Sequence, residues 1–412
     1  MTPRFIVIGL SDSIEESGIG NEAKRIIAFH HLFSGGERHH ELVGALLPTS
    51  YEWIDIKVPL DSVFAQYAAR EAEEIVVFAS GDPLFFGFAN TIQRKLPEAE
   101  IRLYPTFNSL QQLAHRLVMP YQTMRIVSLT GRPWHELDRA LIERAPLIGL
   151  LTDRTHTPAT IAQRLLDYGF DGYTMAVGEH LGNPEQERIR RLRLEEATTL
   201  TFELPNCVII HCEQPRPRLF GIPERDFALL DGRDKMITKM PIRLLSLSLL
   251  DLYNRQHFWD VGFCTGSVSI EAKNQFPHLH IQAFEVREAG QQLIDENSRR
   301  FHTPGIEAHI GDFLQADLTA LPAPDAVFIG GHGGKLIEMV ARIAERLQPE
   351  GLIVFNSVSE SSLALFQEAC EKAGLHIETE THLTVDAHNP ITLIKAVKPS
   401  IHKSELLNMN KK

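Results

Sequence analysis

FWDVGFCTGSVSIEA, residues 258–272, begins as an apolar run, reaches Asp260, and continues through Gly262 and Gly266 into a helical pattern. Glycines at such a place let the backbone come close to a ligand. Open α/β sheets bind ligands at the carboxyl ends of their strands, which is where this loop lies. The stretch therefore predicts an α/β domain with a ligand site at the end of this strand.

Further strand patterns follow at helix-length intervals. IQAFEV (281–286) carries Glu285 near its end, where an acidic side chain accepts hydrogen bonds from ribose hydroxyls. IEAHIG (306–311) leads into Asp312, DAVFIGG (325–331) and LIVFNSV (352–358) come next, and HIETETHLTV and ITLIKAVK indicate a closing hairpin. The series predicts a mostly parallel sheet with an antiparallel final strand.

A glycine loop alone also fits a plain strand–helix turn or a nicotinamide site. The ordered set of a DxGxxxG loop, a following Glu and a later Gly-Asp is more specific, and it resembles the class I S-adenosylmethionine methyltransferase fold, which is Rossmann-like. Cys264 departs from that family because it stands where the middle glycine is usual. We expect a slightly crowded loop and weaker cofactor binding, with the site intact.

Four separated motifs narrow the resemblance. GIPERDF (221–227), MITKMPIRLLSLSLL (236–250), the 258–272 stretch and LPAPDAVFIGG (321–331) occur in the order seen in the precorrin C15-methyltransferases that decarboxylate the C12 acetate side chain. The resemblance implies a cofactor pocket in the second half of the chain. Its expected lining residues are Thr238, Gly262, Thr265, Gly266, Glu285 and Asp312.

The first half also alternates strand and helix patterns, which predicts α/β structure. Its strand patterns are FIVIGL (5–10), EIVVFAS (74–80), RIVSLTG (125–131), LIGLLTD (147–153), YTMAVGEHLG (173–182) and NCVIIHC (206–212). ASGDPLFFGFA (79–89) places Gly81-Asp82-Pro83 directly after a strand. Taken alone, this motif predicts a tight loop with a buried aromatic pair, Phe85 and Phe86.

The motifs around this loop form a second resemblance. SGGERHHEL (34–42), YPTFNSLQQLA (104–114), SLTGRP (128–133), LLTDRTHTPATIA (150–162) and EHLGNPEQERI (179–189) look like those of the tetrapyrrole methylases, most closely the corrin C5-methyltransferases, over roughly residues 3–212. The resemblance implies a two-lobed α/β fold with the cofactor between the lobes. It implies cofactor contacts at Gly81, Asp82 and Leu84, with Ser109 and Thr130 as neighbours.

The proline- and arginine-rich stretch after Cys212 has no periodicity and is typical of a linker. We therefore expect a tetrapyrrole methylase domain at 1–213, a linker at 214–220, a class I methyltransferase domain at 221–398 and a polar tail at 399–412. Two domains also suit a chain of 412 residues.

Composition excludes several classes of protein. A formal net charge of -12 disfavours nucleic-acid binding, which needs a basic surface. No apolar run reaches the ~20 residues of a membrane span, and the N-terminus lacks the features of a signal peptide. Four cysteines without a CxxC pair indicate neither a disulfide scaffold nor a metal site and suit a reducing compartment, so we expect a cytoplasmic protein.

Together the two resemblances imply an enzyme that uses S-adenosylmethionine to methylate a precorrin-6B-type ring, metal-free or cobalt-bound, at C5 and C15 and to decarboxylate its C12 acetate. They also imply self-association into a homo-oligomer. A nicotinamide-dependent oxidoreductase and a noncatalytic tetrapyrrole carrier are the alternatives. The substrate is rich in carboxylates, so Arg132 and Arg188 are candidate substrate clamps, while Lys239, Arg243 and His332 are candidate catalytic or clamping residues.

Overall fold

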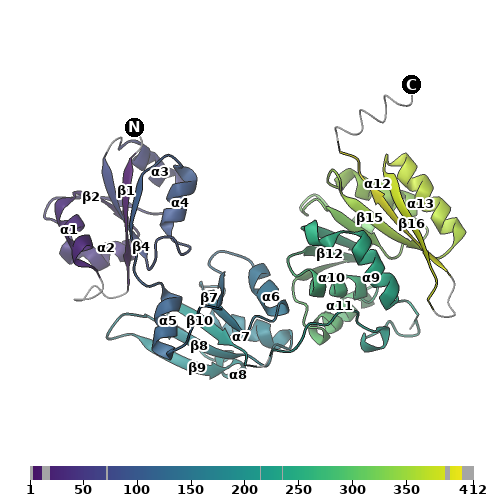
Figure 1. Ribbon diagram of the computed structural model, residues 1–412, viewed down its shortest axis with the longest axis horizontal. Helices are drawn as coiled ribbons and strands as arrows, with labels where there is room; N and C mark the ends of the chain where they lie inside the picture. The colour runs from purple at the N-terminus through teal and green to yellow at the C-terminus, as the bar shows by residue number, and fades with distance from the viewer. Residues whose placement is uncertain are drawn as a thin grey trace. The chain divides into compact units, whose positions relative to one another are not determined.

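A computed structural model describes residues 3–11, 19–70, 73–213, 215–233, 235–385 and 390–400 (Figure 1). The chain divides into two compact units. The first comprises Met1–Arg132, Pro146–Arg164 and Gly172–Gln214, and the second comprises Pro133–Ala145, Leu165–Asp171 and Pro215–Lys412.

The first unit begins with a parallel five-stranded sheet in the order β3-β2-β4-β1-β5. Strands β1 and β4 are central and buried on both faces: alternate β1 residues enter two different apolar clusters, as Phe5 and Ile6 show. The elements are β1 (Arg4–Leu10), α1 (Asn21–Phe29), β2 (Leu32–Gly35), α2 (Glu37–Val43), η1 (Gly44–Leu46), β3 (Glu52–Asp55), α3 (Asp61–Ala68), β4 (Glu74–Ser80), α4 (Phe88–Lys95) and β5 (Ile101–Tyr104).

A second five-stranded sheet has the order β6-β7-β10-β8-β9, in which only β6 and β7 run parallel. Helix α5 starts with a reciprocal cap, because Asn108 and Gln111 each accept a hydrogen bond from the other's backbone N–H. The elements are α5 (Ser109–Leu117), β6 (Arg125–Ser128), α6 (His135–Ile142), β7 (Leu147–Leu151), α7 (Pro158–Asp167), β8 (Thr174–Glu179), β9 (Arg188–Arg193), α8 (Leu194–Ala197) and β10 (Asn206–His211).

The second unit contains a seven-stranded sheet in the order β13-β12-β11-β14-β15-β17-β16, parallel except for β17 and β16. The antiparallel pair confirms the predicted final hairpin. The elements are η2 (Glu224–Asp226), α9 (Met240–Leu249), η3 (Leu252–Asn254), β11 (His257–Val261), α10 (Ser267–Gln275), β12 (His280–Glu285), α11 (Ala289–Arg300), β13 (Ile306–Ile310), η4 (Phe313–Gln315), β14 (Ala326–Ile329), α12 (Leu336–Arg346), β15 (Leu352–Ser357), α13 (Glu360–Lys372), β16 (His376–Leu383) and β17 (Ile391–Val397).

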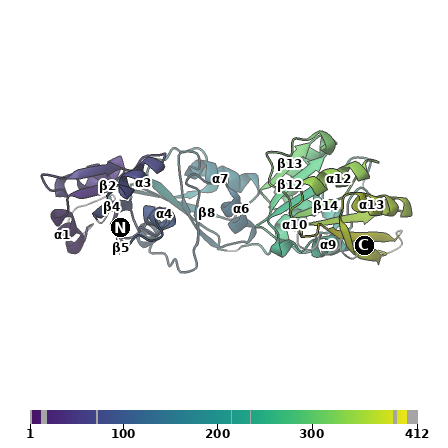
Figure 2. The same cartoon turned by 90° about the horizontal axis from the view of Figure 1, so that it is seen from above.

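Helices cover both faces of this sheet (Figures 1 and 2). Trp259 and Val261 of β11 pack with α12 and α13, whereas Phe258 of the same strand packs with α9 and α10. Helix α12 buries its residues at i, i+3, i+4 and i+7 from Leu336, as an amphipathic helix on a sheet should. The resulting three-layer sandwich brings the carboxyl ends of the parallel strands to one edge.

The predicted strands are all present, and four others, β2, β3, β5 and β9, were not predicted. One prediction in the first unit is wrong in part: Phe85 packs against an apolar cluster, but Phe86 is 46% exposed. Residues 401–412 of the predicted tail lie outside the described residues, as does Gln214 of the predicted linker. No helix in the described ranges combines the length and hydropathy needed to cross a bilayer.

Candidate functional site

A cavity of about 580 Å³ opens at the carboxyl ends of β11, β12, β13 and β14 in the second unit. The loops that follow these four strands line the cavity, together with the segment that precedes α9. Five of the six predicted cofactor residues of this half line the cavity: Thr238, Gly262, Thr265, Glu285 and Asp312. The sixth, Gly266, supports the loop from behind, since a Cβ there would lie 2.8 Å from Ile294.

The loop between β11 and α10 depends on its glycines. Gly262 has φ +81°, and a Cβ on it would lie 2.6 Å from the backbone nitrogen of Gly331. Cys264, in place of the usual glycine, also adopts a left-handed conformation, with φ +52°. Its N–H donates to the Glu285 carboxylate at 2.8 Å and its thiol donates to the Met236 carbonyl at 3.2 Å. The loop therefore accommodates the cysteine through two hydrogen bonds.

Glu285 ties this loop to the end of β12. Its carboxylate accepts hydrogen bonds from the Cys264 N–H and from the backbone and guanidinium of Arg287. A carboxylate offers about four acceptor positions, so these three bonds leave capacity for a ligand hydroxyl. Glu285 is thus oriented by the protein with its carboxylate at the cavity wall.

Asp260 was not in the predicted site, yet it has the most unusual environment there. It is completely buried, and one carboxylate oxygen accepts from the Ser269 N–H and hydroxyl at 3.1 and 2.6 Å. The other oxygen, Oδ1, has no partner among the described residues, and neither does the buried hydroxyl of Thr265. Burial raises the pKa of Asp260 to about 7. Both residues line the cavity, so a bound ligand could supply the partners that these two groups lack.

The loop after β14 reads Gly330-Gly331-His332-Gly333-Gly334. Gly334 donates its N–H to Nδ1 of His332 at 3.2 Å, so the neutral imidazole carries its hydrogen on Nε2. Burial lowers the pKa of His332. His332 and Lys239 both line the cavity, and Lys335 beside them pairs with Asp312 at 2.8 Å.

Arg243 does not face the cavity, which corrects its assignment as a clamp. Its side chain is fully buried and donates to Glu271 at 3.2 Å and to the Thr238 carbonyl at 2.8 Å. A guanidinium enclosed in this way cannot reach a substrate carboxylate. It instead supports the backbone of Thr238, which lines the cavity.

In the first unit the predicted residues lie on the loops after β4 and β6 and at the starts of α5 and β9. Gly81 has φ +62°, and a Cβ on it would lie 2.9 Å from the Cα of Asn108, so the loop after β4 packs against the start of α5 and Ser109. Asp82 accepts a hydrogen bond from the Leu84 N–H at 2.9 Å. Arg188 is exposed at the start of the edge strand β9.

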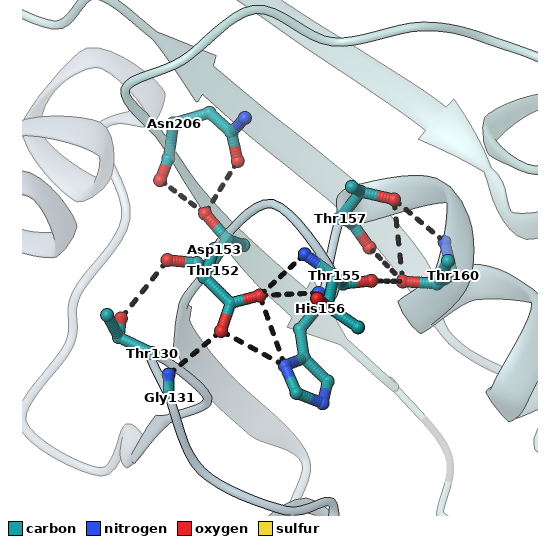
Figure 3. Close-up of polar contacts among 9 residues, drawn as sticks. All are labelled: Thr130, Gly131, Thr152, Asp153, Thr155, His156, Thr157, Thr160 and Asn206. Carbon is teal, nitrogen blue, oxygen red and sulfur yellow. Dashed lines mark hydrogen bonds and ion pairs between the residues drawn. The ribbon is translucent and has the colours of Figure 1, made fainter.

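Thr130 belongs to a polar network that joins the loops after β6 and β7 (Figure 3). Its hydroxyl donates to the Thr152 carbonyl at 3.1 Å, and Asp153 accepts from the Gly131 N–H at 2.8 Å and from the N–H groups of Thr155 and His156. The N–H groups of His156 and Gly131 are the main reason that the pKa of Asp153 is strongly lowered. The sequence prediction missed Asp153, whose partner Gly131 comes from a separate loop.

Within the described ranges, no group of three or more His, Cys, Asp or Glu side chains is arranged to hold a metal ion.

Two family models match the chain. Residues 59–198 match the tetrapyrrole (corrin/porphyrin) methylases, and residues 231–405 match the precorrin methyltransferase domain. A precorrin-6Y C(5,15)-methyltransferase [decarboxylating] from Sinorhizobium sp is 32% identical over 91% of this chain and 89% of its own length.

Two shorter relatives each match part of the chain. A cobalt-precorrin-6B C(15)-methyltransferase (decarboxylating) from Salmonella typhimurium is 39% identical over 34% of this chain and 71% of its own length. A cobalt-precorrin-7 C(5)-methyltransferase from the same organism is 28% identical over 43% of this chain and 84% of its own length.

Proposed function

Because the chain belongs to the family of decarboxylating precorrin-6Y C(5,15)-methyltransferases, we propose that it methylates a precorrin ring at C5 and C15 and removes the C12 acetate carboxyl in cobalamin biosynthesis. S-adenosylmethionine is the methyl donor. Family membership makes the chain an enzyme rather than a pigment carrier, and a methyltransferase rather than a nicotinamide-dependent oxidoreductase.

One observation supports the assignment of reactions to halves: the tetrapyrrole methylase model and the precorrin methyltransferase model match separate parts of this chain, residues 59–198 and 231–405. The relatives also include separate C15-methylating and C5-methylating enzymes. We assign C5 methylation to residues 1–213 and C15 methylation with decarboxylation to residues 221–398, joined by a linker at 214–220 and followed by a tail at 399–412. Strand β10 ends at His211 and β11 begins at His257, which supports this boundary. We assign α6 and α7 to the first domain, although residues 133–145 and 165–171 group with the second compact unit, because both helices connect strands of the second sheet.

The cavity of the second unit suits the methyl donor. The unpartnered Oδ1 of Asp260 would accept from its ammonium group, and Glu285 would accept from its ribose hydroxyls. Thr238, Gly262, Thr265 and Asp312 complete the proposed wall, with Gly266 behind it. When bound, the donor supplies an electrophilic methyl group, so the protein mainly orients the acceptor carbon and excludes water.

In the first unit we propose Gly81, Asp82, Leu84, Ser109 and Thr130 as contacts of the second donor molecule. The loop after β4 and the start of α5, which carry four of them, pack directly against each other at Gly81 and Asn108. Arg132 and Arg188 are the proposed partners of the ring's carboxylates.

Incubation of the intact protein with S-adenosylmethionine and the precorrin-6B ring, followed by product mass measurement, tests the function. Two added methyl groups with loss of carbon dioxide are expected. Parallel reactions with metal-free and cobalt-bound rings identify the form that the protein accepts. An unchanged mass with both rings, when donor binding is detectable, would contradict the corrin substrate.

Asp260 should make donor binding depend on pH. An ionised carboxylate accepts the ammonium better than a protonated one, so the dissociation constant for S-adenosylmethionine at the second site should fall up to about tenfold per pH unit as pH rises toward 7. Because the folded state binds this proton more tightly than the unfolded chain, ligand-free protein should lose stability over the same rise. Asp260→Asn should bind weakly at every pH, as calorimetric titration can show; an unchanged pH profile in this variant would remove Asp260 from the site.

His332 is our candidate for the residue that donates the proton required by decarboxylation. Breakage of the bond to carbon dioxide leaves its electrons on the ring system, and the new terminal carbon must then take up a proton. The protonated imidazole of His332, which lines the cavity, would supply that proton and become neutral. General acids contribute about 10²–10⁴-fold. His332→Asn should therefore slow formation of the decarboxylated product at least tenfold while the affinity for S-adenosylmethionine stays unchanged. Equal slowing in Lys239→Gln, which alters another residue of the cavity lining, would indicate a clamping role for both.

We also propose that the protein works in the cytoplasm and self-associates, as the resembled families do. Light scattering after gel filtration measures the second point directly, and a monomeric mass at micromolar concentration would contradict it.

A further inference from the structure

Phe86 is placed unlike the other aromatic side chains of its loop. Its ring is 46% exposed, whereas neighbouring Phe85 packs into an apolar cluster with α5. Its backbone has φ +53°, a left-handed conformation that bulky residues rarely adopt. Such strain persists where surrounding structure enforces it and is concentrated at functional sites. The exposed ring adds little to the core, so folding does not explain its presence.

The loop itself holds Phe86 in this position. Asp82 accepts hydrogen bonds from the Leu84 and Phe85 N–H groups, through its side chain and carbonyl respectively, and Asn90 donates its side-chain amide to the Leu84 carbonyl at 2.8 Å. A Cβ on Gly87 would lie 2.4 Å from the Pro83 carbonyl oxygen, so the loop closes tightly behind the ring. Phe86 is thus displayed on a fixed turn next to the proposed donor contacts Gly81 and Asp82.

Arg132 covers this ring. Its guanidinium carbon lies 5.0 Å from the centroid of Phe86, within the range of a cation–π contact. Arg132 is exposed, and among the described residues its guanidinium has no carboxylate partner. The aromatic ring covers one flat face of the guanidinium. The N–H groups point outward from its edge and stay available to bind an anion.

The network of Figure 3 fixes the turn that carries Arg132. Asp153 binds the Gly131 N–H at 2.8 Å, the Arg132 N–H donates to the Leu129 carbonyl at 3.1 Å, and Thr130 is bonded to Thr152. Hydrogen bonds therefore hold both the loop after β4 and the loop after β6 in place, and their exposed side chains, Phe86 and Arg132, contact each other.

We propose that Phe86 and Arg132 form a clamp that binds the ring substrate of C5 methylation, an inference that rests on the proposed function. The substrate class has a large apolar ring with carboxylates at its edge. Phe86 offers an apolar face to that ring, and Arg132 offers a bidentate partner to one carboxylate. Neither residue alone supplies both contacts. The pair therefore determines substrate affinity at the first site and leaves donor binding unaffected.

The test uses the full chain with cobalt-precorrin-7 and S-adenosylmethionine, and compares Phe86→Asn, Arg132→Gln and Arg132→Lys. Asparagine tolerates the left-handed conformation, so Phe86→Asn should unfold at the same or a higher temperature than the parent. Both Phe86→Asn and Arg132→Gln should raise KM for the ring about tenfold or more with an unchanged Kd for S-adenosylmethionine. Arg132→Lys should fall between, since it keeps the charge but not the bidentate geometry.

Phe29→Ala and Arg102→Gln, which alter exposed side chains elsewhere in the first unit, are the matched controls and should behave as the parent. Parental KM values in Phe86→Asn and Arg132→Gln would overturn the clamp. A lower melting temperature together with reduced donor affinity in Phe86→Asn would also overturn it, because the ring would then be structural. If the parent itself does not methylate cobalt-precorrin-7 or its metal-free form, the proposed function fails instead.

Discussion

Gly262→Ala is expected to abolish C15 methylation and decarboxylation and to leave C5 methylation intact. The new Cβ would lie 2.6 and 2.7 Å from the backbone nitrogen and oxygen of Gly331, and no side chain can move aside to relieve that contact. The left-handed backbone adds about 1–2 kcal/mol and overpacking about 1–3 kcal/mol. The loops after β11 and β14 must therefore separate, and both line the cavity.

Product masses measure this outcome. With the precorrin-6B ring the variant should leave the mass unchanged or reduce turnover at least 10³-fold, whereas with the precorrin-7 ring it should still add one methyl group. Gly44→Ala is the control, because a Cβ there meets no atom within 4 Å and Gly44 has φ -50°. Normal C15 methylation in Gly262→Ala would show that the cavity is not the site. Loss of both methylations would show that the two reactions are not independent.

Much of the second half was predictable because its signals are local. Strands β11, β12, β14 and β15 are buried on both faces and rich in apolar residues, with unbroken apolar runs in β14 (AVFI) and in the first four residues of β15 (LIVF), so they stand out in the sequence. The glycine loop is also recognisable in the sequence, since position 262 requires a left-handed backbone and has no room for a side chain. Five of six predicted residues therefore line one cavity.

The strands that escaped prediction lack such signals. β2, β3 and β5 have four residues each, too few to show a period. β9, RIRRLR, lies at a sheet edge and is largely exposed, so charge rather than apolar alternation dominates it. An edge strand rich in basic residues is a common way to prevent pairing with other chains, and in sequence it looks like a solvated surface.

Side-chain partners were the least predictable feature. The environments of Asp153 and Asp260 arise only on folding. Asp153 binds the N–H of Gly131 from another loop, and Asp260 is buried against Ser269 of α10. Phe86 was expected to be buried because most phenylalanines are. Arg243 was expected to act as a catalytic or clamping residue, but it is buried against Glu271, which lies 28 residues away in sequence.

Glu271→Ala should be the most destabilising single change outside the cavity. Glu271 and Arg243 are both fully buried and paired at 3.2 Å, and the carboxylate also accepts the N–H groups of Gly221 and Ile222 at 2.9 and 3.0 Å. Removal of the carboxylate leaves the buried Arg243 cation without its counter-ion and two backbone donors without partners. Breaking such a pair costs about 3–5 kcal/mol, against at most ~1 kcal/mol for an exposed pair.

Amide hydrogen exchange measures this loss within the second unit, where peptides from β11 and α10 report its unfolding separately from the first unit. Glu296→Ala is the matched control, because it removes a pair with Arg300 at 2.7 Å whose side chains are 47% and 44% exposed. Protection in β11 should fall about 10²–10⁴-fold in Glu271→Ala, the change that 3–5 kcal/mol produces, and stay nearly constant in Glu296→Ala. Similar losses in both would mean that the buried charge finds another partner. Since Arg243 also holds the Thr238 carbonyl, the same variant should bind S-adenosylmethionine more weakly, which separates a supporting role for Arg243 from direct contact with the ring.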